Sequence, residues 1–166
     1  MATVTLKGNE VHTVGELPAV GSKAADFTLT KNDLSSASLR DFKGSRVILN
    51  IFPSIDTSTC AASVRHFNRD AANLDNTRVL CISRDLPFAQ KRFCGAEGLD
   101  NVITLSDFAT GEFGKRYGLE LADGPLKNLH ARTVFVLDEN HEIIYREIVP
   151  EITEEPDYEA ALAALK

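Results

Sequence analysis

The chain has 166 residues, enough for one domain of ordinary size, and no shift in composition suggests a second, so residues 1–166 are expected to form a single domain. Hydrophobic residues make up 43% of the chain and charged residues 25%, as in globular chains that bury a core. The net charge of −6 and the lack of a Lys/Arg cluster argue against a protein that binds nucleic acid.

The first fifteen residues have the pattern of a β-hairpin. Apolar and polar side chains alternate over residues 1–15 and are interrupted by a turn signal at Gly8 and Asn9. A looser stretch with Pro18 and Gly21 follows, and a further alternating segment then ends at a turn near residues 31–33.

The rest of the chain alternates between strand and helix patterns. Nearly continuous apolar runs predict buried strands over residues 46–52, 78–82 and 102–105. Helices are predicted over residues 57–74, 86–93 and 108–117, the second ending at Gly95. A strand hairpin over 132–138 and 142–148 and a last helix over 156–165 complete an α/β fold with a mixed central sheet flanked by helices. The acidic stretch 151–157 is interpreted as a solvated connection.

The three cysteines, Cys60, Cys81 and Cys94, are too few for a scaffold held together by disulfides. Their odd number favours free, metal-bound or redox-active thiols. No CxxC pair is present, and the four histidines are scattered without an HxxxH pair, so we expect no metal site. The chain also lacks a glycine-rich phosphate loop, and we expect no cofactor.

Residues 53–60 are the strongest candidate for a reactive site, because they lead from a buried strand into the first turn of a helix. A helix N-terminus carries a partial positive charge and unpaired N–H groups, which favour a thiolate over a thiol. Because the thiolate is the nucleophile, Cys60 is predicted to be reactive. Asp56 works against this, since a nearby carboxylate raises the pKa of a thiol, unless Asp56 caps the helix or faces solvent.

The pattern Pro-x-x-x-Thr-x-x-Cys, present as Pro53, Thr57 and Cys60, resembles the active-site signature of the peroxiredoxins. Further segments resemble the bacterial thiol peroxidase subfamily, and they cover residues 50–57, 60–65, 85–90, 92–98 and 122–126. The resemblance covers nearly the whole chain, including the N-terminal hairpin that many other peroxiredoxins lack. It implies a thioredoxin-like fold with an N-terminal β-hairpin, and a homodimer.

The resemblance also implies a role for each residue of the signature. Cys60 is implied to be the peroxidatic cysteine, which attacks a hydroperoxide and becomes a sulfenic acid. Thr57 is implied to orient the thiolate and the peroxide through its hydroxyl, and Pro53 to shield the pocket from water. Arg132 matches an arginine on a later strand, whose guanidinium stabilises the thiolate and the departing oxygen.

Cys94 matches the resolving cysteine of the subfamily, which condenses with the sulfenic acid to give an intramolecular disulfide that thioredoxin reduces. Bridged cysteines need Cα atoms within about 7 Å of each other, and cysteines on separate helices can lie farther apart. We therefore expect the segments around Cys60 and Cys94 to rearrange locally, the second loosened by Gly95 and Gly98. Cys81 is interpreted as a buried core residue.

Several alternatives remain open. Arg46 and Arg65 are possible substitutes for Arg132. A Cys–His hydrolase is a further reading of Cys60, although His66 would point away from it on a regular helix and His130 would also need an orienting Asn or Asp.

The remaining functional alternatives are a disulfide oxidoreductase, a redox sensor and a binding-only relative of the fold. The lack of CxxC counts against the oxidoreductase, and the intact signature with Arg132 counts against the binding-only relative. A sensor would differ in its rate of turnover.

The sequence thus predicts a thiol-dependent peroxidase recycled by thioredoxin. Leu86, Phe88 and Phe93 are expected to be core residues. If they line the pocket entrance instead, organic hydroperoxides would be preferred over hydrogen peroxide, which is also the preference that the subfamily implies.

No apolar run approaches the roughly 20 residues that a membrane-spanning helix needs. The N-terminus lacks the basic segment and apolar stretch of a secretory signal, which favours the cytoplasm and leaves the periplasm open, because a processed chain would look the same.

Overall fold

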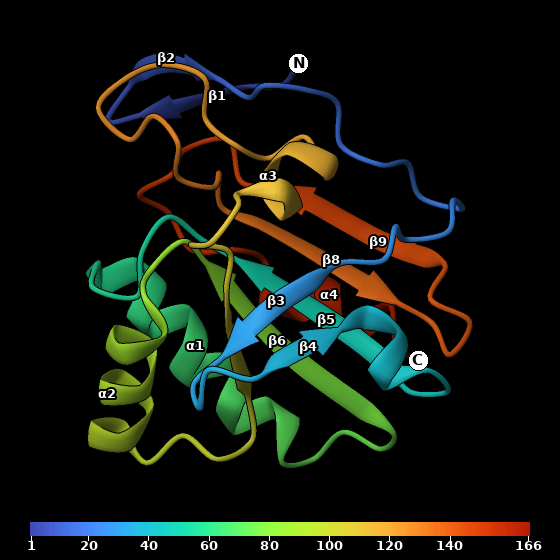
Figure 1. The fold of residues 1–166 in the computed structure, drawn as a ribbon. Coiled ribbons are helices and arrows are strands. Elements are labelled where there is room, and N and C mark those ends of the chain that lie inside the picture. Colours follow the sequence, from blue (N-terminus) through green and yellow to red (C-terminus); the bar gives the residue numbers. More distant parts are fainter.

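The computed structural model describes residues 1–166 and contains a seven-stranded sheet with helices on both faces and a separate two-stranded hairpin (Figure 1). The strands are β1 (Thr3–Leu6), β2 (Asn9–His12), β3 (Thr28–Lys31), β4 (Ser36–Ser38), β5 (Arg46–Ile51), β6 (Thr77–Ser83), β7 (Ile103–Ser106), β8 (Thr133–Leu137) and β9 (Ile143–Ile148). The helices are α1 (Ser58–Ala71), α2 (Pro87–Glu97), α3 (Glu112–Arg116) and α4 (Tyr158–Ala163), with a 3-10 helix η1 (Leu39–Phe42).

The large sheet is mixed and has the strand order β4-β3-β7-β6-β5-β8-β9. Strands β5, β6 and β7 are parallel and are connected by α1 and α2, whereas β3, β4, β8 and β9 pair antiparallel with their neighbours. Because β5 and β6 are adjacent and parallel, their carboxyl ends meet at one edge of the sheet. The loops that follow these two strands therefore lie side by side.

Two apolar layers cover the faces of the sheet, and the alternation of side chains along β5 separates them. Val47, Leu49 and Ile51 face the layer that includes Phe113 of α3. Ile48 faces the opposite layer, which α1, α2 and α4 cover. Phe67 of α1 is completely buried there, and a side chain of this kind contributes about 1.5–3 kcal/mol on burial.

The predicted elements are present, with ends that differ where tertiary contacts decide them. The helix α1 stops at Ala71, and α3 begins only at Glu112, because the carboxylate of Asp107 accepts hydrogen bonds from the first N–H groups of that short helix. The strand β4 and the helix η1 were not predicted. None of the helices is long and apolar enough to cross a membrane.

Two turn predictions were wrong by a few residues. Helix α2 continues through Gly95 and ends at Gly98, which has the left-handed backbone of a helix terminator (φ 63°). The turn of the N-terminal hairpin is formed by Lys7 and Gly8, both with positive φ, so that Asn9 is the first residue of β2. Positive φ at both central residues is the geometry that a two-residue hairpin turn requires.

Candidate active site

Cys60 lies in the first turn of α1, where the sequence places it. Thr57 has an extended backbone and is the N-cap of the helix, and its Oγ1 accepts a hydrogen bond from the Cys60 N–H at 3.2 Å. The Cys60 side chain is 0% exposed and packs in the apolar layer with Ile55 and Val64. A hydroperoxide can therefore reach the sulfur only if the residues that cover it move.

Thr57 connects the helix to the loop before it. The Thr57 hydroxyl donates a hydrogen bond to the carbonyl oxygen of Ser54 at 3.2 Å, and the Thr57 hydroxyl oxygen accepts one from the N–H of Cys60. The proton of this hydroxyl is thus directed at the loop, and it becomes available to a thiolate or a peroxide only when the hydroxyl rotates.

A cavity of about 570 Å³ opens next to the first turn of α1. Three of the predicted residues, Pro53, Thr57 and Arg132, line it together. The other lining residues come from the hairpin, the first turn of α1 and the loops around residues 125 and 152, and they are Leu6, Lys7, Asn9, Ser58, Thr59, Pro125, Leu126, Ile152 and Thr153. The hairpin thus forms one wall of the cavity.

Arg132 precedes β8 and is buried, with 2% exposure. Its Nε donates to the carbonyl oxygen of Ile152 at 2.8 Å, whereas its buried Nη1 has no hydrogen-bond partner. Arg132 lines the cavity. Buried donors are almost always paired, so the unpaired nitrogen of its guanidinium group needs an acceptor. An anion in the cavity, such as a thiolate or a peroxide oxygen, would supply that acceptor.

The two alternative arginines lie elsewhere. The guanidinium of Arg46 donates to the carbonyl oxygens of Leu165 and Asp75 at the opposite end of β5. Arg65 pairs with Glu97 of α2. Neither lines the cavity, so Arg132 is the only one of the three that could act there.

The segment 150–153 holds three parts of the site together. It pairs with the hairpin through Thr5, and its Ile152 carbonyl oxygen accepts the Arg132 hydrogen bond. The carbonyl oxygen of Thr153 accepts the hydroxyl of Thr59 in α1 at 3.0 Å. The prediction of a solvated connection from residue 151 onward was wrong for its first residues, because their backbone groups bind partners distant in sequence.

Glu151 in this segment accepts hydrogen bonds from the backbone N–H groups of Thr153, Gly8 and Lys7. These bonds, that of Thr153 first, lower the pKa of Glu151 to about 2 from 4.5. A carboxyl group whose pKa is lower in the folded than in the unfolded state stabilises the fold fully at pH values above its unfolded-state pKa. This contribution is lost as the pH falls towards its folded-state pKa.

We therefore expect Glu151→Gln to destabilise the protein at pH 6 and to have a much smaller effect at pH 2.5. Urea unfolding at both pH values, with Glu154→Gln as the control on the same segment, measures this. An equal destabilisation at both pH values would contradict it.

Cys94 lies in the last part of α2, with its Sγ 3.9 Å from Thr104 Oγ1. Burial raises the pKa of its thiol, and the contact with Thr104 partly offsets this. Cys94 lines a separate cavity of about 280 Å³, which shares no residue with the cavity beside the first turn of α1, and Cys60 itself lines neither. The structure thus places both predicted cysteines but does not bring them together.

The helices of the two cysteines are in contact through side chains. Arg65 of α1 lies over the ring of Phe93 at 5.6 Å and pairs with Glu97 of α2. Cys60 packs in the apolar layer, whereas Cys94 lines its own cavity, and both thiols are free. A disulfide between them therefore requires a local movement.

Cys81 is a core residue, as predicted. It is 0% exposed in β6, and burial raises its pKa to about 12. Asp56, which could have opposed a thiolate, is exposed and pairs with Arg92 at 3.0 Å, and Thr57 takes the capping position.

No histidine is placed to act with Cys60. His66 stacks on Tyr158 with ring centroids 3.6 Å apart. His130 is buried and pairs with Asp107 at 2.9 Å, against Phe113 on the opposite face of the sheet. The hydrolase alternative therefore lacks its base.

Two residues expected in the core are on the surface. Leu86 is 52% and Phe88 is 64% exposed, whereas Phe93 is partly buried in the layer of Cys60. None of the three lines the cavity, whose apolar walls are formed by Leu6, Leu126 and Ile152.

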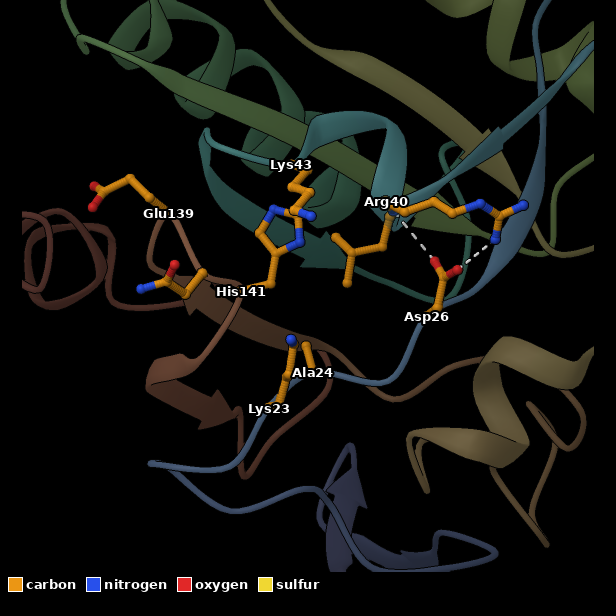
Figure 2. Close-up of a pocket in the computed structure, with 9 residues that line it drawn as sticks. Lys23, Ala24, Asp26, Arg40, Lys43, Glu139 and His141 are labelled. Atoms are coloured by element: carbon orange, nitrogen blue, oxygen red, sulfur yellow. Dashed lines mark hydrogen bonds and ion pairs between the residues drawn. The ribbon is translucent and has the colours of Figure 1, made fainter.

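A further cleft of about 300 Å³ lies at the other end of β5, between η1 and the β8–β9 turn (Figure 2). Its charges are mixed, because Lys23, Lys43, Glu139 and the ion pair of Arg40 with Asp26 all line it. None of the predicted site residues lines it. No three His, Cys, Asp or Glu side chains are grouped to hold a metal ion.

The chain is similar to known proteins over nearly its whole length. The family model described as Redoxin matches residues 19–162. The chain is 57% identical over 165 residues to the proteins named thiol peroxidase from Mycobacterium bovis and Mycobacterium tuberculosis, covering 99% of this chain and of each relative.

Two solved structures have the same fold over nearly the whole chain. A peroxiredoxin-like protein from Aquifex aeolicus matches with a TM-score of 0.93 at 37% identity, covering 99% of this chain and 96% of that one. A thiol peroxidase from Chromobacterium violaceum matches with a TM-score of 0.91 at 21% identity, covering 98% and 94%. The predicted thioredoxin-like fold with an N-terminal hairpin is confirmed. The chain therefore belongs to the Redoxin family and, within it, to the bacterial thiol peroxidases, which are peroxiredoxin-type enzymes.

Proposed function

We propose that the enzyme reduces hydroperoxides at Cys60, resolves the product with Cys94 and is recycled by thioredoxin. The observation that carries this is that Arg132, whose buried Nη1 has no hydrogen-bond partner, lines the cavity beside the helix turn of Cys60. A positive group and a helix N-terminus at one cavity favour a thiolate and stabilise the charge that develops on a departing oxygen.

The proposed chemistry has two steps on the enzyme. The Cys60 thiolate bonds to the terminal oxygen of the hydroperoxide, the O–O bond breaks, and the alkoxide leaves as an alcohol after taking a proton. Cys60 becomes a sulfenic acid, oxidised by two electrons. The Cys94 thiolate then attacks that sulfur, an S–S bond forms and hydroxide leaves as water, after which the thioredoxin dithiol reduces the disulfide by exchange.

The second step needs the local rearrangement that the sequence predicts. The two helices are joined by the Arg65–Glu97 ion pair, and both partners are partly exposed, so the pair is a weak link. A side chain at Gly95 of α2 would meet no neighbouring atom, so packing does not require glycine there, and glycine adds flexibility at the resolving segment.

A preference for organic hydroperoxides is supported by the cavity walls. Leu6, Leu126 and Ile152 offer apolar surface to an alkyl or aryl group, and hydrogen peroxide gains nothing from it. The hairpin supplies Leu6, so this wall depends on the hairpin being in place.

The test is to add one equivalent of cumene hydroperoxide or hydrogen peroxide to the reduced enzyme and to map its thiols. We expect a Cys60–Cys94 disulfide with Cys81 free, faster formation with cumene hydroperoxide, and full reduction by thioredoxin with many turnovers. A disulfide that includes Cys81, or a protein oxidised without turnover, would refute the proposal, and the second result would favour a redox sensor.

We also propose a homodimer. Its support is the exposed apolar surface of Leu86, Phe88 and Phe108, where the Ser106 hydroxyl joins the backbones of residues 85 and 108. Such apolar surface is typical of contacts between proteins. Sedimentation of the wild type should give a dimer and Phe88→Asp a monomer, with Leu34→Asp as an exposed apolar control. A wild-type monomer at micromolar concentration would exclude it.

A further inference from the structure

Asp85 belongs to a segment that resembles the thiol peroxidases but has no role in the proposed reaction. It lies two residues after the end of β6, at the sheet edge where the parallel neighbour β5 runs into the loop before Cys60. The two loops therefore face each other, and Asp85 is the charged side chain between them.

The carboxylate of Asp85 accepts three hydrogen bonds. Oδ1 accepts the hydroxyl of Ser54 at 2.7 Å, and Oδ2 accepts the N–H of Ile55 at 2.7 Å and the hydroxyl of Ser83 at 2.6 Å. Hydrogen bonds to a carboxylate are stronger than those between neutral groups. Asp85 thus fixes both the backbone and a side chain of the loop before α1.

From Ser54 the hydrogen bonds continue to Cys60. The carbonyl oxygen of Ser54 accepts both the N–H and the hydroxyl of Thr57, each at 3.2 Å. The hydroxyl oxygen of Thr57 in turn accepts the N–H of Cys60 at 3.2 Å. Displacing Ser54 would therefore turn the helix cap away from Cys60.

The same cluster reaches the helix of the other cysteine. Gln90 of α2 is 0% exposed, and its Nε2 donates to the Ser83 hydroxyl at 3.1 Å and to the carbonyl oxygen of Leu105 at 2.9 Å. Gln90 and Cys94 are four residues apart and so share one face of α2. Ser83 is the common partner of Asp85 and Gln90.

We propose that Asp85 is a positioning residue that holds the Cys60 loop, and through Ser83 and Gln90 the start of the Cys94 helix, in the arrangement in which Thr57 caps the Cys60 helix and the cavity wall is formed. Loss of its carboxylate then has opposite effects on the two steps. Reaction with the hydroperoxide slows, because the helix cap and the cavity wall are displaced. Disulfide formation keeps its rate or becomes faster, because the segments that must move are less restrained.

The experiment compares Asp85→Ala, which removes both acceptor oxygens and so all three hydrogen bonds, with Asp85→Asn, which keeps one oxygen. Asp26→Ala is the matched control, because Asp26 also accepts backbone N–H groups but lies at the far cleft. Rapid quenching follows loss of the Cys60 thiol and appearance of the disulfide separately. Alkylation of Cys60 against pH, in a Cys81→Ser, Cys94→Ser background, reports the state of the thiol itself.

We expect Asp85→Ala to react with cumene hydroperoxide about 10- to 100-fold more slowly, since a small displacement of a reacting group has effects of this size. The alkylation profile should shift to higher pH, Asp85→Asn should be intermediate, and Asp26→Ala should match the wild type. Disulfide formation after oxidation should be unchanged or faster in both Asp85 variants. Equal slowing of both steps, or an unchanged rate and alkylation profile, would overturn the inference.

Ser54→Ala keeps the test decisive if Asp85→Ala does not fold, because it removes only the hydroxyl bonded to Oδ1 from a half-buried site. It should slow the peroxide step in the same direction, and a wild-type rate would overturn the inference. The inference rests on the proposed reaction of Cys60, and the experiment distinguishes the failure of the inference from the failure of the proposed function. If the wild type reacts without Cys60, the proposed function is wrong, whereas a Cys60-dependent enzyme indifferent to Asp85 refutes the inference alone.

Discussion

Cys60→Ser is expected to lose all peroxide consumption in an assay coupled to thioredoxin, thioredoxin reductase and NADPH, while Cys81→Ser is expected to keep the wild-type rate. Serine retains the size of the side chain but not a nucleophile that ionises in the first turn of a helix. Cys81 is the matched control, because it is an equally buried cysteine whose pKa is raised to about 12 by its surroundings.

Cys94→Ser completes this series and is expected to consume one equivalent of hydroperoxide and then stop. Its Cys60 sulfenic acid would have no resolving thiol, so thioredoxin would receive no intramolecular disulfide to reduce. Trapping that sulfenic acid with dimedone, detected by mass, distinguishes a blocked second step from a damaged first step. Continued cycling of Cys94→Ser with thioredoxin would show a one-cysteine enzyme, and loss of activity in Cys81→Ser would show that the core assignment of Cys81 is wrong.

Arg132→Met is expected to lower the rate constant for oxidation of Cys60 about 100- to 1,000-fold, the size of effect seen when a single oxyanion donor is removed. The buried Nη1 of Arg132 has no partner within the protein, so it is free to bind the thiolate or the departing oxygen. Single-turnover kinetics with cumene hydroperoxide measure the change. Arg132→Lys should recover only a small part of the rate, because an ammonium group lacks the planar fork of donors.

Measuring the stability of the Arg132 variants distinguishes a loss of catalysis from a loss of folding. Replacing a buried, partly unpaired charge by an apolar side chain of similar size is often neutral for stability, although the bond from Nε to Ile152 is lost. The control is Arg46→Met, an arginine that also donates to backbone carbonyl oxygens but at the opposite end of β5. We expect folded Arg132→Met with little activity and fully active Arg46→Met. A folded Arg132→Met with the wild-type rate constant would refute the role of Arg132.

Local patterns in the sequence determined the central elements and the position of the reactive cysteine. The apolar runs of β5 and β6 are predictable because strands buried on both faces can hold few polar side chains. The start of α1 is predictable because Thr57 caps it through a hydrogen bond to Cys60, only three residues away in sequence. The position of Cys60 in a first helical turn follows from these two features.

Burial and element ends were less predictable, because they depend on what each segment packs against. Leu86 and Phe88 have the side chains of core residues, yet they lie on the outer surface of their segment. The helix α2 passes Gly95, whose flexibility alone does not end a helix, and stops at Gly98, where the backbone becomes left-handed. Residue type alone does not decide between these outcomes.

Only the tertiary structure decided which residues complete the site. Asp85 meets Ser54 because two parallel strands end at one sheet edge, and Glu151 meets Gly8 across almost the whole length of the chain. Arg132 could be matched to a family position, but its unpaired Nη1 depends on every neighbour around it. Short-range sequence patterns therefore predict the position of the nucleophile. Its surroundings depend on hydrogen bonds between distant segments, which produce no periodic pattern in the sequence.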